Sequence, residues 1–461
     1  MSSDKPKFEY LKQVLLGASS GVLILALSIW GINASAGASG TGTKTPTSTK
    51  TPDATETPTT EPVGTCSIKD QASDAKLGTF TGQVVNLTNG EVLYDNGANQ
   101  PSITASSVKI LAATAAMQAL GPNFRMSTKV VYSPSHPDTV VLVGGGDPTL
   151  RRPGGSSSVY RNAPKMTDLA QQVKDWATAN GITAINHLVL DASLITGSTW
   201  DSSWPTYERT AGYQPLITGL MVDGDRKNPA YAKSPRSTDP VGRAGREFKT
   251  ALGDIAANAD ITTGLAAGGA TKIAEVKSAK LPTLINYMLS ASDNTLAEYL
   301  ARHVAISQGL PANLESIQSG YQKALATFNL DWTGVVVKDG SGESKFDVVT
   351  PALFNGIMAR LTTPTTGNLH DILKGFPIAG KTGTLAGRFT GANSSARGHV
   401  FAKTGSILHA YALVGYMNAK DGSQLAFAFF ASGPATSNST RTSLDTVTAA
   451  VYECGAQLSN K

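Results

Sequence analysis

The hydrophobic and polar positions divide the chain into an apolar N-terminal run, a polar segment and a long mixed body. Residues 14–32 carry no charge and are mostly apolar, and three lysines precede them. A helix of about 20 residues spans a bilayer, and flanking basic residues stay on the cytoplasmic side. The pattern predicts a transmembrane anchor at 13–33 after a cytoplasmic N-terminus at 1–12. Secretion after cleavage near Ala36 and a buried core helix remain alternatives.

The segment that follows has the composition of a linker. Residues 34–65 are rich in Thr, Pro, Ser, Gly and Ala, and they contain no aromatic residue, leucine or isoleucine. Such a segment cannot bury enough apolar surface to form a core. We therefore predict a disordered linker at 34–65, which would hold the body outside the membrane.

The body mixes strand-like and helix-like patterns. Residues 81–97 alternate around Asn89-Gly90, which predicts a hairpin, and 409–432 predict a second one. Residues 107–120 are Ala-rich and predict a helix that ends at a Gly-Pro pair. The class predicted is α+β. Further strands are expected at 127–133, 138–150 and 185–193, and further helices at 166–180 and 281–308.

Charge and cysteine content exclude several kinds of protein. The chain has 461 residues with 39 basic and 34 acidic side chains, a net charge of +5, which does not suggest nucleic-acid binding. Two cysteines and six scattered histidines exclude iron–sulfur clusters and four-cysteine zinc sites, so no metal is expected. Cys66 and Cys454 lie at the two ends of the body. In an exported protein they could form a disulfide or remain separate thiols.

Three Ser-x-x-Lys sequences occur, beginning at Ser2, Ser73 and Ser106. Only Ser106 opens a predicted helix, and Lys109 follows one turn later on the same face. A serine becomes a nucleophile only when a base takes its proton, and a buried lysine can be that base. An N-cap serine beside a solvated lysine is the alternative.

Two later motifs favour the catalytic interpretation. Ser292-Asp293-Asn294 precedes a helical stretch, and Lys403-Thr404-Gly405-Ser406 precedes the late hairpin. Ser-x-x-Lys, Ser-x-Asn and Lys-Thr-Gly, in this order, form the active-site set of penicillin-binding proteins and serine β-lactamases. The order of the motifs, their helical context and the predicted export of the body all favour this interpretation.

The resemblance extends to one family. Most of residues 76–435 resembles the S13 peptidases, the low-molecular-mass class C penicillin-binding proteins, which are D-alanyl-D-alanine carboxypeptidase/endopeptidases. The matching stretches are "TASSVKILAATAAMQALG", "LVGGGDPTL", "PLITGLMVDGD", "MLSASDNTLAEYLAR", "VVKDGSGES" and "HVFAKTGSILHAYALVGYM".

The resemblance implies an architecture. Between Lys109 and Ser292 stand 182 residues, and this family has such a gap because extra domains are inserted there. We expect a β-lactamase/transpeptidase-like catalytic domain, an antiparallel sheet with helices, made of 66–127 and 277–461. Mainly β or mixed domains are expected in the insertion at 128–276.

The resemblance also implies roles for the residues of the three motifs. Ser106 would attack the D-Ala-D-Ala carbonyl, and Lys109 would take its proton. Ser292 and Lys403 would relay the proton to the leaving amine, and Asn294 would hold a substrate amide and orient Lys109. Neither a metal nor an organic cofactor is needed.

Substrate contacts are implied in the same way. Thr404 and Ser406, with Gly405 between them, would bind the terminal carboxylate beside Lys403. Glu208 and Tyr213 would lie near the pocket for the substrate side chain and could hold a free ammonium. Surface loop residues are the alternative for this pair.

The sequence departs from the family at two places and duplicates one motif. Glu343 stands in "DGSGES" where the family has Leu, and Ser406 replaces the final Thr of Lys-Thr-Gly-Thr. A second copy begins at Lys381, but only the copy at Lys403 runs into the hairpin, so Lys403 is favoured.

The partners follow from this interpretation. They are peptidoglycan stem peptides, β-lactam antibiotics as covalent inhibitors, and a cell membrane reached through the N-terminal helix. A serine β-lactamase and a catalytically inactive cell-wall-binding protein are the competing hypotheses.

Overall fold

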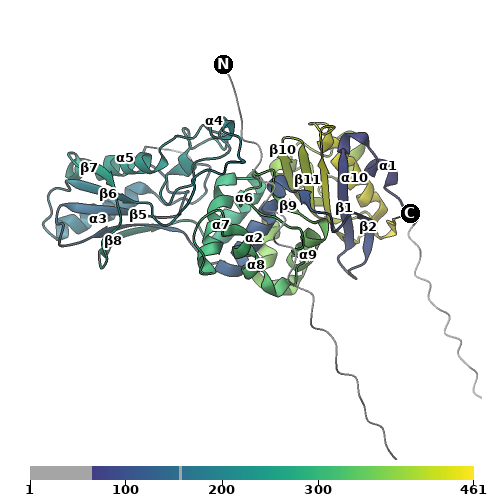
Figure 1. The fold of residues 1–461 in the computed structure, drawn as a ribbon, viewed down its shortest axis with the longest axis horizontal. Helices are drawn as coiled ribbons and strands as arrows, with labels where there is room; N and C mark the ends of the chain where they lie inside the picture. Colours follow the sequence, from purple (N-terminus) through teal and green to yellow (C-terminus); the bar gives the residue numbers. More distant parts are fainter. Residues whose placement is uncertain (1–64, 155–157, 461) are drawn as a thin grey trace, which may run out of the picture. The chain divides into compact units, whose positions relative to one another are not determined.

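The computed structural model describes residues 65–154 and 158–460 (Figure 1). The predicted membrane segment at 13–33 lies outside these residues, as does the predicted linker up to residue 64. Within the two described ranges, no helix is both long and apolar enough to cross a membrane.

The first sheet is built from both ends of the body. Its order is β10-β11-β12-β1-β2, and all neighbouring strands run antiparallel. Both predicted hairpins are confirmed, because β1 pairs with β2 and β11 pairs with β12. The strands are β1 (Thr79–Asn86), β2 (Val92–Asn96), β10 (Val400–Ile407), β11 (Ala410–Asn418) and β12 (Gln424–Ser432).

This sheet is covered on both faces. Side chains alternate along a strand, so Val414 and Phe430 enter one core and Leu413 and Phe427 enter the other. Continuous apolar runs in β11 and β12 therefore reflect two buried faces rather than one. On the second face lies α10 (Thr440–Cys454), with the short helix α1 (Lys69–Ala72) packed against α10.

Helices on the other face contribute to the larger core. Helix α2 contacts α6, α7 and α8, and these four lie together in Figure 1, while α9 packs on β12 and β1. The structure confirms the two predicted helical stretches within 281–308. The helices are α2 (Lys109–Leu120), α6 (Leu281–Ala291), α7 (Asn294–Ser307), α8 (Ile317–Ala324) and α9 (Pro351–Thr362). Strand β3 (Ser102–Ile103) precedes α2 in the chain, and β9 (Val348–Val349) precedes α9. The two strands pair as a two-stranded sheet.

The chain between α2 and α6 forms a second five-stranded sheet of order β7-β6-β5-β4-β8. Strand β4 pairs antiparallel with β5 and β8, whereas β5, β6 and β7 run parallel. No strand is shared with the first sheet in the described part of the chain. The strands are β4 (Ser127–Tyr132), β5 (Thr139–Gly145), β6 (His187–Asp191), β7 (Asp260–Thr263) and β8 (Thr271–Lys277).

Helices connect the parallel strands of this second sheet. Parallel neighbours need a long crossover, and here α3 (Met166–Ala179) joins β5 to β6 while α5 (Pro240–Leu252) lies between β6 and β7. The apolar sides of both helices are buried in one core with Leu188 and Leu190 of β6. They contribute to this core through Leu169 and Val173 of α3 and Phe248 of α5. The short helix α4 (Tyr207–Ala211) lies in the loop-rich chain after β6. The chain between α2 and α6 thus contains both strands and helices.

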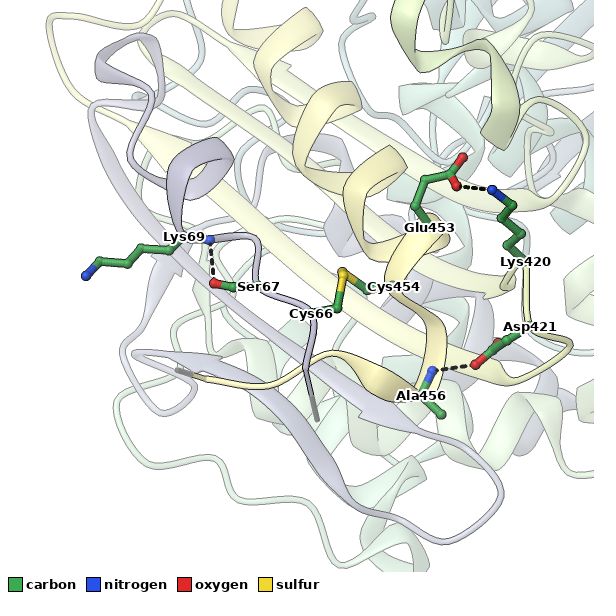
Figure 2. Close-up of a disulfide and its surroundings, with 8 residues drawn as sticks. All are labelled: Cys66, Ser67, Lys69, Lys420, Asp421, Glu453, Cys454 and Ala456. Carbon is green, nitrogen blue, oxygen red and sulfur yellow. Dashed lines mark hydrogen bonds and ion pairs between the residues drawn. A yellow bond between two sulfur atoms is a disulfide. The ribbon is translucent and has the colours of Figure 1, made fainter. Parts of the chain in front are cut away.

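A disulfide joins Cys66 to Cys454 at the end of α10 (Figure 2). Their Cα atoms are 5.5 Å apart across a sequence separation of 388 residues. Backbone hydrogen bonds flank the bridge, from Cys66 N to Gln457 O at 3.0 Å and from Ser459 N to Cys66 O at 2.9 Å. The first and last parts of the described chain are thus fixed to each other.

Candidate active site

Ser106 and Lys109 lie where a short 3-10 helix, Ala105–Val108, meets α2. The predicted helix therefore exists, but Ser106 precedes its α-helical part. Lys109 is fully buried, and its Nζ donates a hydrogen bond to Ser106 Oγ at 2.8 Å. This geometry places the amine where, once neutral, it can accept the hydroxyl proton.

The surroundings of Lys109 fix the position of its amine and lower its pKa. Its Nζ also donates to Asn294 Oδ1 at 2.8 Å and to the Ser341 carbonyl oxygen at 2.5 Å. Burial lowers the pKa of Lys109 to about 8. Nearby carboxylates act in the opposite direction and raise this pKa, and Glu343 has the largest such effect. A lysine in this range is a usable base near neutral pH.

Ser292 and Lys403 form a second hydroxyl–amine pair. Ser292 ends α6 in the left-handed backbone region with a φ of 58°, an arrangement common at functional sites. Lys403 Nζ donates to Ser292 Oγ at 2.9 Å and to the Thr404 carbonyl oxygen at 2.8 Å. Burial, and then the charge of Lys109, lower the pKa of Lys403 well below its usual value. Two lysines and two serines therefore meet in one site.

The Lys-Thr-Gly-Ser motif lies along β10, the edge strand of the first sheet. Gly405 allows close approach, because a Cβ there would lie 2.5 Å from the Thr104 carbonyl oxygen and 3.1 Å from Ala105 Cβ. The strand consequently runs directly beside the backbone that carries Ser106. The Ser406 side chain is exposed and Thr404 is half-buried, so both hydroxyls are accessible from this edge.

Two neighbours of this motif were not expected from the sequence. Thr404 Oγ1 lies 2.8 Å from Thr384 Oγ1, and Arg441 Nη2 donates to Ser406 Oγ at 3.1 Å. Thr384 belongs to the second Lys-Thr-Gly-Thr copy, whose Lys381 is exposed. That copy therefore reaches the site through its threonine, whereas Lys403 is the lysine bonded to Ser292.

Glu208 is brought to the site and Tyr213 lies near it. Glu208, in α4, is buried and close to Glu343, and burial raises its pKa. Glu343 Oε2 accepts a hydrogen bond from Asn294 Nδ2 at 2.9 Å. Tyr213 is exposed, with Lys233 Nζ 4.6 Å from its ring centroid. The sequence departs from the family pattern at Glu343, but this departure alone did not assign the residue a role.

The loop that carries Ser341 is held by two carboxylates. Glu298 Oε1 accepts from Gly340 N at 3.0 Å and from Ser341 N at 2.9 Å, and Asp339 Oδ2 accepts from Ser344 N at 2.8 Å. Sequence reasoning missed both carboxylates. They fix the backbone oxygen to which Lys109 donates.

Ser106 and Ser292 are each hydrogen-bonded to a buried lysine at the edge of an antiparallel sheet packed between helices. This constellation defines the class of serine enzymes that includes penicillin-binding proteins and serine β-lactamases. The sequence pattern of the D-Ala-D-Ala carboxypeptidase 3 (S13) family matches residues 65–235 and 227–451. The chain belongs to this family, and it is a serine hydrolase, a D-Ala-D-Ala carboxypeptidase.

Curated relatives cover most of the chain. A carboxypeptidase of Mycobacterium tuberculosis is 33% identical over 398 residues, which is 85% of this chain and 84% of the relative. Carboxypeptidase DacB of Mycolicibacterium smegmatis is 32% identical over 382 residues, 82% of this chain and 81% of the relative.

A solved structure shows the same fold. The crystal structure of penicillin binding protein 4 from Haemophilus influenzae matches with a TM-score of 0.69 and 20% identity, over 84% of this chain and 97% of that one. A second structure of that protein, complexed with a β-lactam, matches with a TM-score of 0.64 and 20% identity, over 84% of this chain and 98% of that one. The expected transpeptidase-like fold is thereby confirmed.

Proposed function

We propose that the substrate is a peptidoglycan stem peptide ending in D-Ala-D-Ala and that Ser106 Oγ is the nucleophile. The observation that carries this assignment is the hydrogen bond of 2.8 Å between Lys109 Nζ and Ser106 Oγ. Neutral Lys109 takes the hydroxyl proton as Ser106 Oγ bonds to the carbonyl carbon of the penultimate D-Ala. The bond to the terminal D-Ala nitrogen then breaks and leaves an ester on Ser106.

Lys403 and Ser292 deliver the proton that the leaving amine needs. Their hydroxyl–amine contact of 2.9 Å supports a relay from the protonated Lys109 through this pair to the departing nitrogen. Water then attacks the ester, and the Ser106 hydroxyl and the shortened peptide are released. Asn294 keeps Lys109 in place and binds an amide of the stem.

The strand that carries the second motif binds the charged parts of the substrate. The backbone N–H groups of Ser106 and Ser406 form the oxyanion hole, a contribution often worth a few kcal/mol. The Thr404 and Ser406 hydroxyls bind the terminal carboxylate beside Lys403. The close approach of β10 at Gly405 supports this arrangement, because it brings the two backbones together.

Glu208 and Tyr213 recognise a free ammonium on the stem side chain. The buried Glu208 carboxylate lies near Glu343 in the site, and Tyr213 offers an exposed ring that already has one cation over it. An acid and an aromatic ring are both attractive to an ammonium group.

β-Lactams acylate the same serine and remain attached to it. The β-lactam complex of the Haemophilus influenzae relative supports this assignment. The test is labelling with a fluorescent penicillin: the wild type is labelled and Ser106→Ala is not. Ser73→Ala is the matched control, because Ser73 begins another Ser-x-x-Lys sequence but is exposed at the end of α1. Labelled Ser106→Ala would overturn the assignment.

Penicillin labelling and nitrocefin turnover together separate the competing functions. A long-lived adduct excludes an inactive cell-wall-binding protein, and fast turnover of nitrocefin would indicate a β-lactamase instead.

In the domain assignment that we propose, 66–127 and 277–461 form the catalytic domain and 128–276 the insertion. The protein is held at the cell membrane by residues 13–33, with this domain outside the cytoplasm. Secretion after cleavage near Ala36 is the competing location.

A further inference from the structure

Glu343 places a carboxylate inside the active site, at a position where the S13 resemblance predicts a leucine. Its Oε2 accepts a hydrogen bond from Asn294 Nδ2 at 2.9 Å, and Asn294 Oδ1 accepts from Lys109 Nζ at 2.8 Å. A carboxylate accepts and an ammonium donates, so only one orientation of the Asn294 amide satisfies both partners. Glu343 thereby selects the orientation that presents the amide oxygen to Lys109.

The groups around this contact make its charge effective. Glu343 is half-buried, and Lys109 is fully buried. Charges in such surroundings interact more strongly than charges in water. The titratable groups facing Glu343 are Glu208, Tyr207, Asp339 and Lys109, and those facing Lys109 also include Asp293, Glu298 and Lys403.

We propose that Glu343 is a positioning residue for acylation, which orients Asn294 and sets, through its charge, the pH at which Lys109 becomes a base for Ser106. This inference rests on the proposed function, in which Lys109 takes the serine proton. In this role Glu343 acts through Asn294 and Lys109.

The sign of the effect follows from the charges. Burial, and then the neighbouring Glu208 and Asp339, raise the pKa of Glu343 to about 7. Ionised Glu343 favours the protonated form of Lys109 and so raises the pKa of that amine. Removing the negative charge should therefore let Lys109 lose its proton at a lower pH.

Two substitutions separate charge from hydrogen bonding. Glu343→Gln removes the charge and keeps an oxygen that can accept from Asn294 Nδ2, whereas Glu343→Leu removes both. The second-order rate of acylation by a fluorescent penicillin is measured from pH 5 to pH 10. In both variants we expect the midpoint of the acidic limb to move to lower pH, by about half a unit or more. Only Glu343→Leu should also show a plateau rate lower by about fivefold, because Asn294 loses its acceptor.

Glu315→Gln is the matched control, since Glu315 is an exposed glutamate outside the site. An unmoved midpoint in a Gln variant that still becomes acylated would overturn the inference while leaving the proposed function intact. An equal shift in the control would overturn it as well. If the Leu variant does not fold, the isosteric Gln variant decides. Failure of the wild type to become acylated at any pH would instead overturn the proposed function.

Discussion

Arg226, in the chain between α2 and α6, and Asp293, at the start of α7, form a buried ion pair. Arg226 Nη2 donates to Asp293 Oδ2 at 2.6 Å, and the side chains are 1% and 4% exposed. Asp293 Oδ1 in turn accepts from Leu296 N at 2.8 Å and so caps α7. The next residue, Asn294, contacts Lys109. The chain between α2 and α6 therefore helps to fix Asn294, the residue that contacts the proposed base.

Breaking this pair should destabilise the protein and slow acylation. Arg226→Met leaves the Asp293 carboxylate buried without its cation, which costs about 3 to 5 kcal/mol in comparable cases. We expect a lower free energy of unfolding in urea and slower labelling by penicillin at 25 °C. Arg246→Met is the control, because the Arg246–Asp239 pair is mostly exposed and such pairs contribute little. Equal losses in the two variants would contradict the role of burial.

The rate of acylation should depend on the protonation of Lys109. Because burial lowers the pKa of Lys109 to about 8, the amine gains its proton below this pH and ceases to be a base. We expect the second-order acylation rate to rise with pH, with a midpoint near pH 8, and to be nearly abolished in Lys109→Met. Stopped-flow labelling at constant ionic strength gives the profile. A rate that stays constant from pH 6 to pH 9 would exclude Lys109 as the acceptor.

Glu208 should affect substrates that carry a side-chain ammonium. In Glu208→Gln the carboxylate charge is lost while the shape remains, so KM should rise about three- to tenfold for a stem peptide with a free ammonium. Acetylation of that ammonium provides the control substrate, for which wild type and variant should have the same KM. Equal effects on both peptides would contradict a charge-specific contact.

The sequence predicted those features that depend on local pattern. Alternation around Asn89-Gly90 was enough for the β1–β2 hairpin, because the turn and its strands are neighbours in the chain. The order of the three motifs identified Ser106, Lys109, Ser292, Asn294 and Lys403, which the structure brings together. These motifs could be found in the sequence because the proposed reaction restricts which residue types can occupy their positions.

The contacts that sequence reasoning missed join residues far apart in the chain. Arg226 and Asp293 are 67 positions apart, Asn294 and Glu343 are 49 apart, and Ser406 and Arg441 are 35 apart. No periodicity links such residues, because tertiary packing alone decides which polar groups meet. The 3-10 turn at Ser106 was missed for a related reason: its backbone packs against Gly342 and Gly405, which lie elsewhere in the chain.

Removing the disulfide should lower stability without abolishing acylation. The bridge from Cys66 to Cys454 restricts the unfolded chain across 388 residues, and native disulfides commonly contribute about 2 to 5 kcal/mol. The double variant Cys66→Ser/Cys454→Ser should therefore unfold at lower urea concentration. At 25 °C its acylation rate should match that of the wild type, because the bridge lies at the far end of α10 from Arg441. Unfolding at the same urea concentration as the wild type under oxidising conditions would contradict this.

Arg441 should contribute to recognition of the terminal carboxylate. Its guanidinium donates to Ser406 Oγ at 3.1 Å, which places a permanent cation beside the hydroxyl that we assign to the carboxylate. Arg441→Gln should raise KM about three- to tenfold for a peptide ending in free D-Ala-D-Ala, because a charge-assisted hydrogen bond is lost. The value of kcat should change little, since Arg441 makes no contact with Ser106 or Lys109 in the described hydrogen bonds. Arg360→Gln, at an exposed site on α9, is the matched control. A peptide with an amidated C-terminus tests the contact itself, since it lacks the carboxylate and its KM should not distinguish Arg441→Gln from wild type.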